Sequence, residues 1–237
     1  WSDPAVKPDE LKIYPCMLLE NADLYAYWQR GEYQPYTEEE VTEILVECMV
    51  NTPRYARLTR IIRDIPTDNV VEGFKKANLR QIAAQRLKKR GLRCMDIRSR
   101  EIRRDTVTAE DLHLRIDTYT TDATAEHFLS FETTDDRIAG FLRLSLPDQT
   151  QELPLPELKN HAMIREVHVY GPALPIGEES QGEAQHIGLG SQLIDKAKEI
   201  SKAAGYSHLA VISAIGTQKY YEKHNFQITG LYMTTAL

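Results

Sequence analysis

Cysteine is scarce in this chain, which holds only Cys16, Cys48 and Cys94 among 237 residues. The three are odd in number, widely spaced and outside any C-x-x-C pair, which argues against a disulfide framework, a four-cysteine zinc site and an iron–sulfur cluster held by this chain alone. Long apolar runs are also missing, since none approaches the roughly 20 residues that span a bilayer, and no signal-peptide pattern opens the chain. We therefore expect a cytoplasmic protein with reduced, mostly buried thiols, no membrane segment and no metal site.

The sequence also lacks an initiating methionine. It starts at Trp1, and residues 1–9 read like a connector from the middle of a protein, so we expect a fragment of a longer chain. With 42% hydrophobic residues, a chain of this length can bury one large core or two modest ones.

Positive charge is concentrated in one block. Residues 54–104 hold 16 lysines and arginines against 5 acidic residues, whereas the whole chain has a net charge of −6. Such a block favours a polyanion partner, most simply nucleic acid, although a solvated basic helix face is the commoner meaning of a charge run. The side chains that we expect to contact RNA are Arg54, Arg57, Arg60, Arg86, Lys88, Lys89, Arg90, Arg93, Arg98 and Arg100.

The first half alternates strand and helix signals, which is typical of an α/β unit. Strands are predicted at residues 11–19 and 55–66, and helices at 21–31, from Thr37 onward and at 78–90. Thr37 and Glu40 have the spacing of a capping box, followed by an apolar stripe that includes Ile44, and Asn78 is the expected N-cap of the third helix. Residues 92–104 are a basic connector or strand.

The second half begins with alternating sequences typical of antiparallel strands, at residues 112–120, 127–132, 138–146 and 162–170. A loop rich in proline, glycine and acids follows at 171–183. Beyond it we predict a helix that ends near Gly205, a strand at 209–213, a short helix at 218–224 and one last strand at 226–233.

Between that loop and the helix stands the motif Gln185-x-x-Gly188-x-Gly190. Two glycines at the start of a helix leave backbone N–H groups open, and these together with the helix dipole can hold phosphate oxygens. The motif is neither a Walker loop nor the three-glycine dinucleotide fingerprint. Gly-x-Gly before a helix is also an ordinary loop-to-helix joint, so the six residues alone leave both interpretations open.

Longer motifs carry a family resemblance. MIREVHVYG (163–171), QHIGLG (185–190) and VISAIGTQKYY (211–221) resemble the GNAT acetyltransferase domain of the Elongator catalytic subunit family, which acts on the wobble uridine of tRNA. LKIYP (11–15), RDIP (63–66), NLR (78–80) and RCMDIRSRE (93–101) are similar to the end of that family's radical S-adenosylmethionine domain and the linker after it. The resemblance covers nearly the whole chain.

The resemblance implies an α/β (α+β) protein in which the C-terminal remnant of a radical S-adenosylmethionine α/β barrel (residues 1–91) and a basic linker (92–104) precede a GNAT acyltransferase fold (105–237). That fold has a mixed, mostly antiparallel sheet with flanking helices, and the strand before the glycine loop splays from its neighbour. The implied function is the acetyl-CoA-dependent acetyltransferase portion of a tRNA wobble-uridine modifying enzyme, with tRNA binding and tRNA-stimulated hydrolysis of acetyl-CoA. S-adenosylmethionine and a 4Fe-4S cluster belong to the full-length family and are not expected in this chain.

The resemblance also assigns roles. Tyr220 is the expected acid for the departing thiolate and Tyr221 the tyrosine that contacts CoA. Apart from the resemblance, Glu166 and His168 share one face of their strand and are candidates for a base and its partner, although such pairs are more often structural. The backbone N–H groups of Leu189, Gly190, Ser191 and Gln192 would bind the pyrophosphate, and those of Val167 and Val169 would orient the pantetheine. The full set expected at the cofactor is Glu166, Val167, His168, Val169, Gln185, His186, Gly188, Leu189, Gly190, Ser191, Gln192 and Tyr221.

Two further functions stay open: a protein-lysine or small-amine acetyltransferase of the same fold, and an RNA-binding scaffold fragment whose CoA site is idle. The expected partners are tRNA and acetyl-CoA, and the resemblance adds further Elongator-type subunits. A zinc site at Cys94-x-Asp96 is not expected, because the motif supplies at most two of the usual four ligands. The acidic loop at 172–183 is a candidate lid over the CoA site.

Overall fold

The computed structural model describes residues 1–63, 65–76, 78–103, 107–150, 155–171 and 188–237. It divides into two compact units, one of residues 8–99 with Trp1 and one of residues 100–237 with residues 2–7. None of the helices within the described ranges is long and apolar enough to span a bilayer. The candidate lid and residues Gln185 and His186 lie outside these ranges.

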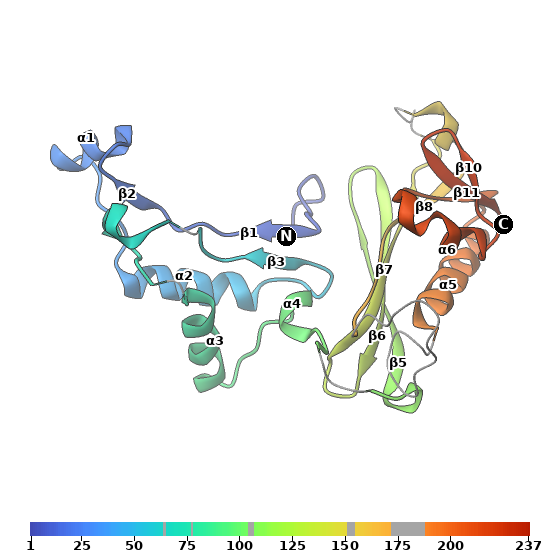
Figure 1. Cartoon of the computed structure of the whole chain (residues 1–237), viewed down its shortest axis with the longest axis horizontal. Helices are drawn as coiled ribbons and strands as arrows, with labels where there is room; N and C mark the ends of the chain where they lie inside the picture. Colours follow the sequence, from blue (N-terminus) through green and yellow to red (C-terminus); the bar gives the residue numbers. More distant parts are fainter. Residues whose placement is uncertain (64, 77, 104–106, 151–154, 172–187) are drawn as a thin grey trace. The chain divides into compact units, whose positions relative to one another are not determined.

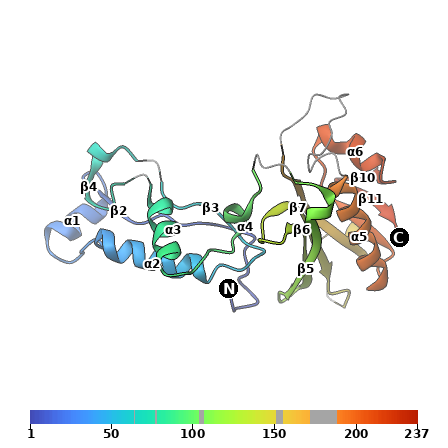
Figure 2. The same cartoon turned by 90° about the horizontal axis from the view of Figure 1, so that it is seen from below.

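The first unit combines short strands with helices (Figures 1 and 2). In chain order its elements are β1 (Glu10–Lys12), β2 (Met17–Leu19), α1 (Asp23–Gln29), α2 (Glu38–Val50), β3 (Arg57–Arg60), the 3-10 turn η1 (Thr67–Asn69), β4 (Val70–Gly73), α3 (Leu79–Lys89) and α4 (Ile97–Arg100). β1 pairs in parallel with β3, and β2 pairs antiparallel with β4. The apolar faces of α2 and α3 meet in a core that contains Leu45, Met49, Leu58, Leu79 and Leu87.

Two strand predictions in this unit are wrong in extent. The single strand expected at residues 11–19 is two strands, because the chain leaves one pairing before Pro15, which has no N–H to donate to a ladder, and enters another after it. Of residues 55–66, only Arg57–Arg60 form a strand. β4 was not predicted, and α4 lies where a connector or strand was expected. Each has only four residues, which is too few to show the hydrophobic periodicity of a strand or a helix.

Of the two predicted helix caps, one forms and the other does not. The capping box of α2 is confirmed: the Glu40 backbone N–H donates to Thr37 Oγ1 at 3.2 Å, and the Thr37 N–H donates to Glu40 Oε2 at 2.7 Å. Asn78 stands at the start of α3 but makes no side-chain cap. The apolar stripe of α2 is confirmed except at Ile44, which is 47% exposed.

The second unit contains a seven-stranded sheet with the order β10-β11-β9-β8-β7-β6-β5. Its elements are η2 (Ala109–Asp111), β5 (Leu112–Thr120), β6 (Thr124–Thr133), β7 (Ile138–Pro147), η3 (Pro156–Leu158), β8 (His161–Val169), α5 (Leu189–Ala203), β9 (His208–Val211), η4 (Ile215–Thr217), α6 (Gln218–Glu222), β10 (Gln227–Thr229) and β11 (Tyr232–Ala236). Neighbouring strands are antiparallel except β8 and β9, which are parallel. The predicted alternating strands are thus confirmed, β5 to the residue.

α5 covers one face of this sheet (Figures 1 and 2). Its inward residues Leu193, Ile194 and Ala197 are fully buried and pack on Leu142, Ile164 and other strand residues. This core fixes the helix against β7, β8 and β9, and so fixes where its N-terminus lies. The last predicted strand, 226–233, is instead the start of a hairpin, because Gly230 adopts φ +62° and reverses the chain between Thr229 and Tyr232.

Candidate acetyl-transfer site

The site begins where β8 parts from β9. The parallel ladder runs from His161 beside His208 to Ile164 beside Val211 and then stops. β8 continues to Val169 with β7 on its other side. Within the described ranges, no strand pairs with residues 165–169 on the β9 side, so this edge faces the space under the start of α5.

A bulge in β8 decides which side chains face that space. Arg143 of β7 lies opposite Glu166, whereas the next residue, Leu144, lies opposite Ile164, so Arg165 is one residue more than β7 can match. The extra residue shifts the alternation, and both Ile164 and Val167 consequently pack against the core under α5. Val169 follows two residues later on the same face.

The N-terminus of α5 closes the space from above. Gly188 is its N-cap in the left-handed region, with φ +71°, and carries no side chain that could cap the helix. The first intrahelical bond runs from the Gln192 N–H to the Gly188 carbonyl at 3.1 Å. The N–H groups of Leu189, Gly190 and Ser191 therefore have no acceptor within the helix, and the positive end of the helix dipole adds to them.

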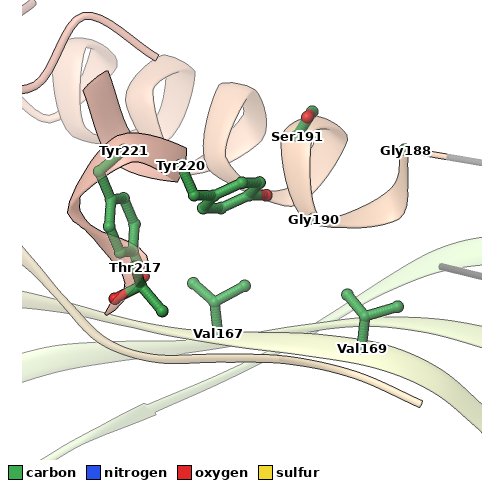
Figure 3. A pocket seen from close by; sticks show the side chains of 8 residues that line it. All are labelled: Val167, Val169, Gly188, Gly190, Ser191, Thr217, Tyr220 and Tyr221. Carbon is green, nitrogen blue, oxygen red and sulfur yellow. The ribbon is translucent and has the colours of Figure 1, made fainter. Parts of the chain in front are cut away.

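These elements enclose a cavity of about 410 Å³. It is lined by Val167, Val169, Gly188, Gly190, Ser191, Thr217, Tyr220 and Tyr221. Figure 3 shows both valines pointing up from β8 and Tyr220 lying between them and the first turn of α5. Thr217, which the sequence reasoning missed, comes from the turn before α6.

Gly190 is required by close packing rather than by its backbone angles. A Cβ on this residue would lie 2.4 Å from the Tyr220 hydroxyl oxygen and 3.7 Å from a methyl carbon of Val169. Real Cβ atoms essentially never approach another atom so closely, so the absence of a side chain is what lets the phenol reach the helix start. A single methyl group at residue 190 would therefore displace the Tyr220 phenol at this end of the cavity.

The two adjacent tyrosines take different environments. Tyr221 is 8% exposed and packs in the main core, and burial raises its pKa to about 12. Tyr220 is half-buried; burial raises the pKa of its phenol, a hydrogen-bond interaction with Ser191 lowers it, and the charge of Asp195 raises it. Both phenols are thus protonated at neutral pH, and both line the cavity.

Glu166 and His168 do share a strand face, as predicted, but it is the face away from the cavity. Glu166 accepts a hydrogen bond from Arg143 Nε at 2.8 Å, and His168 stacks on Phe141 with ring centroids 5.8 Å apart. The Arg143 guanidinium is itself 2% exposed and lies over the rings of Phe128 and Phe141. Regular alternation from the core residue Ile164 would place residues 166 and 168 on the core face; the bulge at Arg165 moves them to the other face.

The structure bears on two more of the predicted cofactor residues. The Gln192 N–H is already bonded to Gly188, which speaks against its predicted contact with a pyrophosphate. The Leu189 side chain is buried in the core, so only its backbone can face a ligand.

The predicted RNA-binding residues fall into two groups. Acidic residues of α2 neutralise part of the basic block, because Arg86 pairs with Glu39 and Glu43, and Arg90 pairs with Glu43 at 2.8 Å. Arg100 is 3% exposed and pairs with buried Glu132 at 2.8 Å, so its guanidinium is not accessible to a phosphate and the predicted RNA contact is not supported. These three arginines have structural roles.

The remaining basic residues lie nearer the surface. Arg54 and Arg57 are half-buried, and the exposed Arg98 donates to the Thr59 carbonyl. The side chains that the structure leaves exposed on the surface of the first unit, beside Arg90 and Arg98, are Arg60, Lys88, Lys89 and Arg93.

Cys94 and Asp96 form a buried structural cluster. The Cys94 thiol donates to Asp96 Oδ1 at 3.2 Å, and the same carboxylate accepts the backbone N–H groups of Leu58 and Ser99 at 3.0 and 3.1 Å. Burial raises the pKa of the Cys94 thiol to about 12, which keeps it protonated. In the described ranges no three His, Cys, Asp or Glu side chains form a group that could hold a metal ion.

The chain belongs to the acetyltransferase (GNAT) family, whose sequence profile matches residues 92–226. A second profile, that of the Radical_SAM C-terminal domain, matches residues 8–89. Both fold classes expected from the sequence are thereby confirmed.

Individual relatives cover nearly the whole chain. It is 34% identical to the tRNA uridine(34) acetyltransferase of Methanocaldococcus jannaschii over 98% of its length, and 34% identical to Elongator complex protein 3 of Schizosaccharomyces pombe over 99%. It also matches the solved structure of an archaeal Elp3 from Methanocaldococcus infernus, lacking residues 1–46, with a TM-score of 0.85 and 34% identity over 97% of this chain and 56% of that one. The chain spans 44% of the length of these two curated relatives. The resemblance to the Elongator catalytic subunit family is therefore confirmed.

Proposed function

We propose that this chain is the acetyltransferase portion of a tRNA wobble-uridine modifying enzyme, and that it binds acetyl-CoA in the cavity under the start of α5. The observation that carries the proposal is the meeting of three features at one cavity: the edge of β8 beyond the β9 ladder, the uncapped N-terminus of α5 and the Tyr220 phenol. The printed names of the relatives, tRNA uridine(34) acetyltransferase and Elongator complex protein 3, supply the substrate class.

The residues present suit the pieces of acetyl-CoA. The N–H groups of Leu189, Gly190 and Ser191 would donate hydrogen bonds to the pyrophosphate oxygens, because they lack intrahelical acceptors and lie at the positive end of the helix. The edge of β8 around Val167 would take the pantetheine arm by strand-like pairing. Bound acetyl-CoA would supply a thioester whose sulfur needs a proton when it departs.

Tyr220 is the proposed proton donor. Its phenol reaches the cavity, and burial raises its pKa, so it carries its proton at neutral pH. Tyr221 would contact CoA through the part of its ring that lines the cavity. We do not propose Glu166 or His168 as groups that act inside this cavity, because their strand face points away from it and Glu166 is held by Arg143.

Binding and hydrolysis of acetyl-CoA test this proposal. Calorimetric titration should give binding of acetyl-CoA, and release of free CoA thiol should report hydrolysis that tRNA accelerates. Tyr220→Phe should lower hydrolysis by about 10- to 100-fold with little change in binding, since it removes only the proton donor. The control Tyr27→Phe changes an exposed tyrosine of α1 and should leave both unchanged. Absence of acetyl-CoA binding would refute the proposed site, and release of CoA thiol only when an amine acceptor is present would favour a lysine or small-amine acetyltransferase.

The tRNA proposal rests on the exposed part of the basic block. Lys88→Gln with Lys89→Gln should weaken tRNA binding and reduce the slope of log affinity against log salt by up to about 2, because two phosphate contacts are lost. Lys159→Gln with Lys202→Gln removes the same charge from exposed positions of the second unit and should leave the slope unchanged. Equal slopes in both variants would show that the tRNA surface lies elsewhere.

The domain boundaries at 91 and 104 are part of the proposal, as are S-adenosylmethionine, a 4Fe-4S cluster and Elongator-type subunits as cofactors and partners of the longer protein. This chain's cysteines do not suit the cluster, because Cys94 is bonded to Asp96 while Cys16 is exposed and Cys48 lies on α2. We therefore assign no step of the radical chemistry to these residues.

A further inference from the structure

One histidine next to Tyr220, His224, has no role in the acetyl transfer proposed above. His224 follows the C-terminus of α6, and its ring lies 5.1 Å from the Tyr220 ring at an angle of 66°. Its Nε2 atom is 3.2 Å from Ser191 Oγ, on the first turn of α5. The ring is partly exposed, so it connects that turn with solvent.

Ser191 is the link between this histidine and the cavity. Ser191 lines the cavity together with Tyr220, whose hydroxyl lies against Gly190, the preceding residue, and the Ser191 hydroxyl lies within hydrogen-bond distance of His224. A hydroxyl can accept one proton and donate another, so it can pass a proton between two neighbours. The order from solvent to cavity is therefore imidazole, hydroxyl, phenol.

We propose that His224 supplies protons from solvent to Tyr220 through Ser191, and so returns the phenol to its protonated form. The inference rests on the proposed acetyl transfer and names a positioning and relay residue for it, not a group that touches the substrate. It explains why a polar, titratable side chain lies next to this half-buried phenol.

In the proposed relay, one proton moves in total from solvent to the CoA sulfur. As the carbon–sulfur bond breaks, the electron pair stays on sulfur and the Tyr220 hydroxyl gives it a proton. The Ser191 hydroxyl then protonates the phenolate, and His224 Nε2 gives its proton to the serine oxygen. The imidazole takes one proton from water at Nδ1, and no oxidant or reductant is needed.

The surroundings of His224 suit a neutral relay. Burial lowers the pKa of its imidazole; the charge of Asp195 raises it, and those of Lys198 and Lys223 lower it. The ring is therefore neutral near pH 7, with one nitrogen able to donate while the other accepts. The Lys198 ammonium also donates to the His224 carbonyl at 2.6 Å, which holds this residue against α5.

Kinetics with three variants test the relay. His224→Gln keeps a hydrogen-bonding side chain of similar reach but cannot relay a proton, so kcat for acetyl-CoA hydrolysis should fall about 10-fold with KM unchanged, and the pH profile should lose its acidic limb. Ser191→Ala should have the same effect, while Ser191→Thr, which keeps the hydroxyl and the backbone N–H, should retain most of the rate. His161→Gln, at the opposite end of β8, is the control and should match the parent protein.

Nuclear magnetic resonance of the ligand-free protein gives a readout that does not depend on activity. The imidazole nitrogens of His224 should titrate with a midpoint below the ordinary value of 6.5, and Ser191→Ala should shift the Nε2 signal while leaving His161 unchanged. Parent kinetics and an unchanged pH profile in both His224→Gln and Ser191→Ala would overturn the relay. Failure of the parent protein to bind or hydrolyse acetyl-CoA would instead overturn the proposed function, so the two failures are distinguishable.

Discussion

Gly190→Ala is the sharpest perturbation that the structure offers, because it adds one methyl group at the point where α5, β8 and α6 meet. The new Cβ would lie 2.4 Å from the Tyr220 hydroxyl oxygen, whereas ordinary contacts begin at 3.4 Å. The phenol must therefore move by about 1 Å or more. Because the clash involves the far end of a side chain and not the backbone, the tyrosine can turn aside and the helix can keep its place.

The cost to stability should be small. Overpacking costs about 1–3 kcal/mol, but alanine inside a helix is favoured over glycine by about 0.5–1 kcal/mol, and the two effects partly cancel. The displaced phenol then occupies part of the cavity at the first turn of α5. If it weakens acetyl-CoA binding by about 1–2 kcal/mol, the dissociation constant rises roughly 5- to 30-fold. We thus expect a variant whose thermal unfolding is nearly that of the parent and whose binding is impaired.

Thermal unfolding measures the stability of the variant, and calorimetric titration measures its affinity for acetyl-CoA. The same Gly190→Ala change made in a Tyr220→Phe protein is the matched control. Removing the hydroxyl removes the 2.4 Å clash and leaves the ring carbon Cζ at 3.5 Å from the new Cβ, an ordinary contact. Adding Gly190→Ala to Tyr220→Phe should therefore change binding by less than about 2-fold.

Two results would refute this reasoning. Parent-like binding by Gly190→Ala would mean that acetyl-CoA does not use the start of α5. A loss of binding that persists undiminished in the Tyr220→Phe background would mean that the methyl group acts on something other than the phenol.

Three further predictions concern the buried polar groups. Glu166→Gln should lower the free energy of unfolding by about 3 kcal/mol in urea titrations, since it removes the carboxylate that faces the Arg143 guanidinium, which is only 2% exposed, and Arg143→Met should cost less because the Glu166 carboxylate that it leaves behind is 37% exposed. Asp96→Asn should cost about 1–3 kcal/mol in the same assay, because an amide cannot accept from two N–H groups and a thiol as the carboxylate does; a parent-like midpoint would contradict the cluster. Cys16 should react with a thiol reagent at pH 8 well before Cys94, whose pKa of about 12 and burial suppress the thiolate; equal rates would contradict that environment.

Local sequence patterns were sufficient where neighbouring residues decide the outcome. The alternation at residues 112–120 predicted β5 to the residue, and the spacing of Thr37 and Glu40 predicted the capping box of α2. The motifs around Gly188 and Gly190 also predicted where a helix N-terminus lies. Each of these depends on contacts within a few residues of the chain, so the information is complete in the sequence.

Long-range partners decided the rest. The sequence contains Arg165 but not the fact that β7 cannot match it, and this bulge sends Glu166 and His168 to the face opposite the cavity. It contains a basic block but not the acidic face of α2 that neutralises Arg86 and Arg90. Likewise, only the packing of α6 against α5 brings His224 to Ser191, 33 residues away in sequence. The sequence by itself thus determined the elements and the family, while the tertiary structure decided which side chains share a cavity, because register and ion pairing depend on residues distant in the chain.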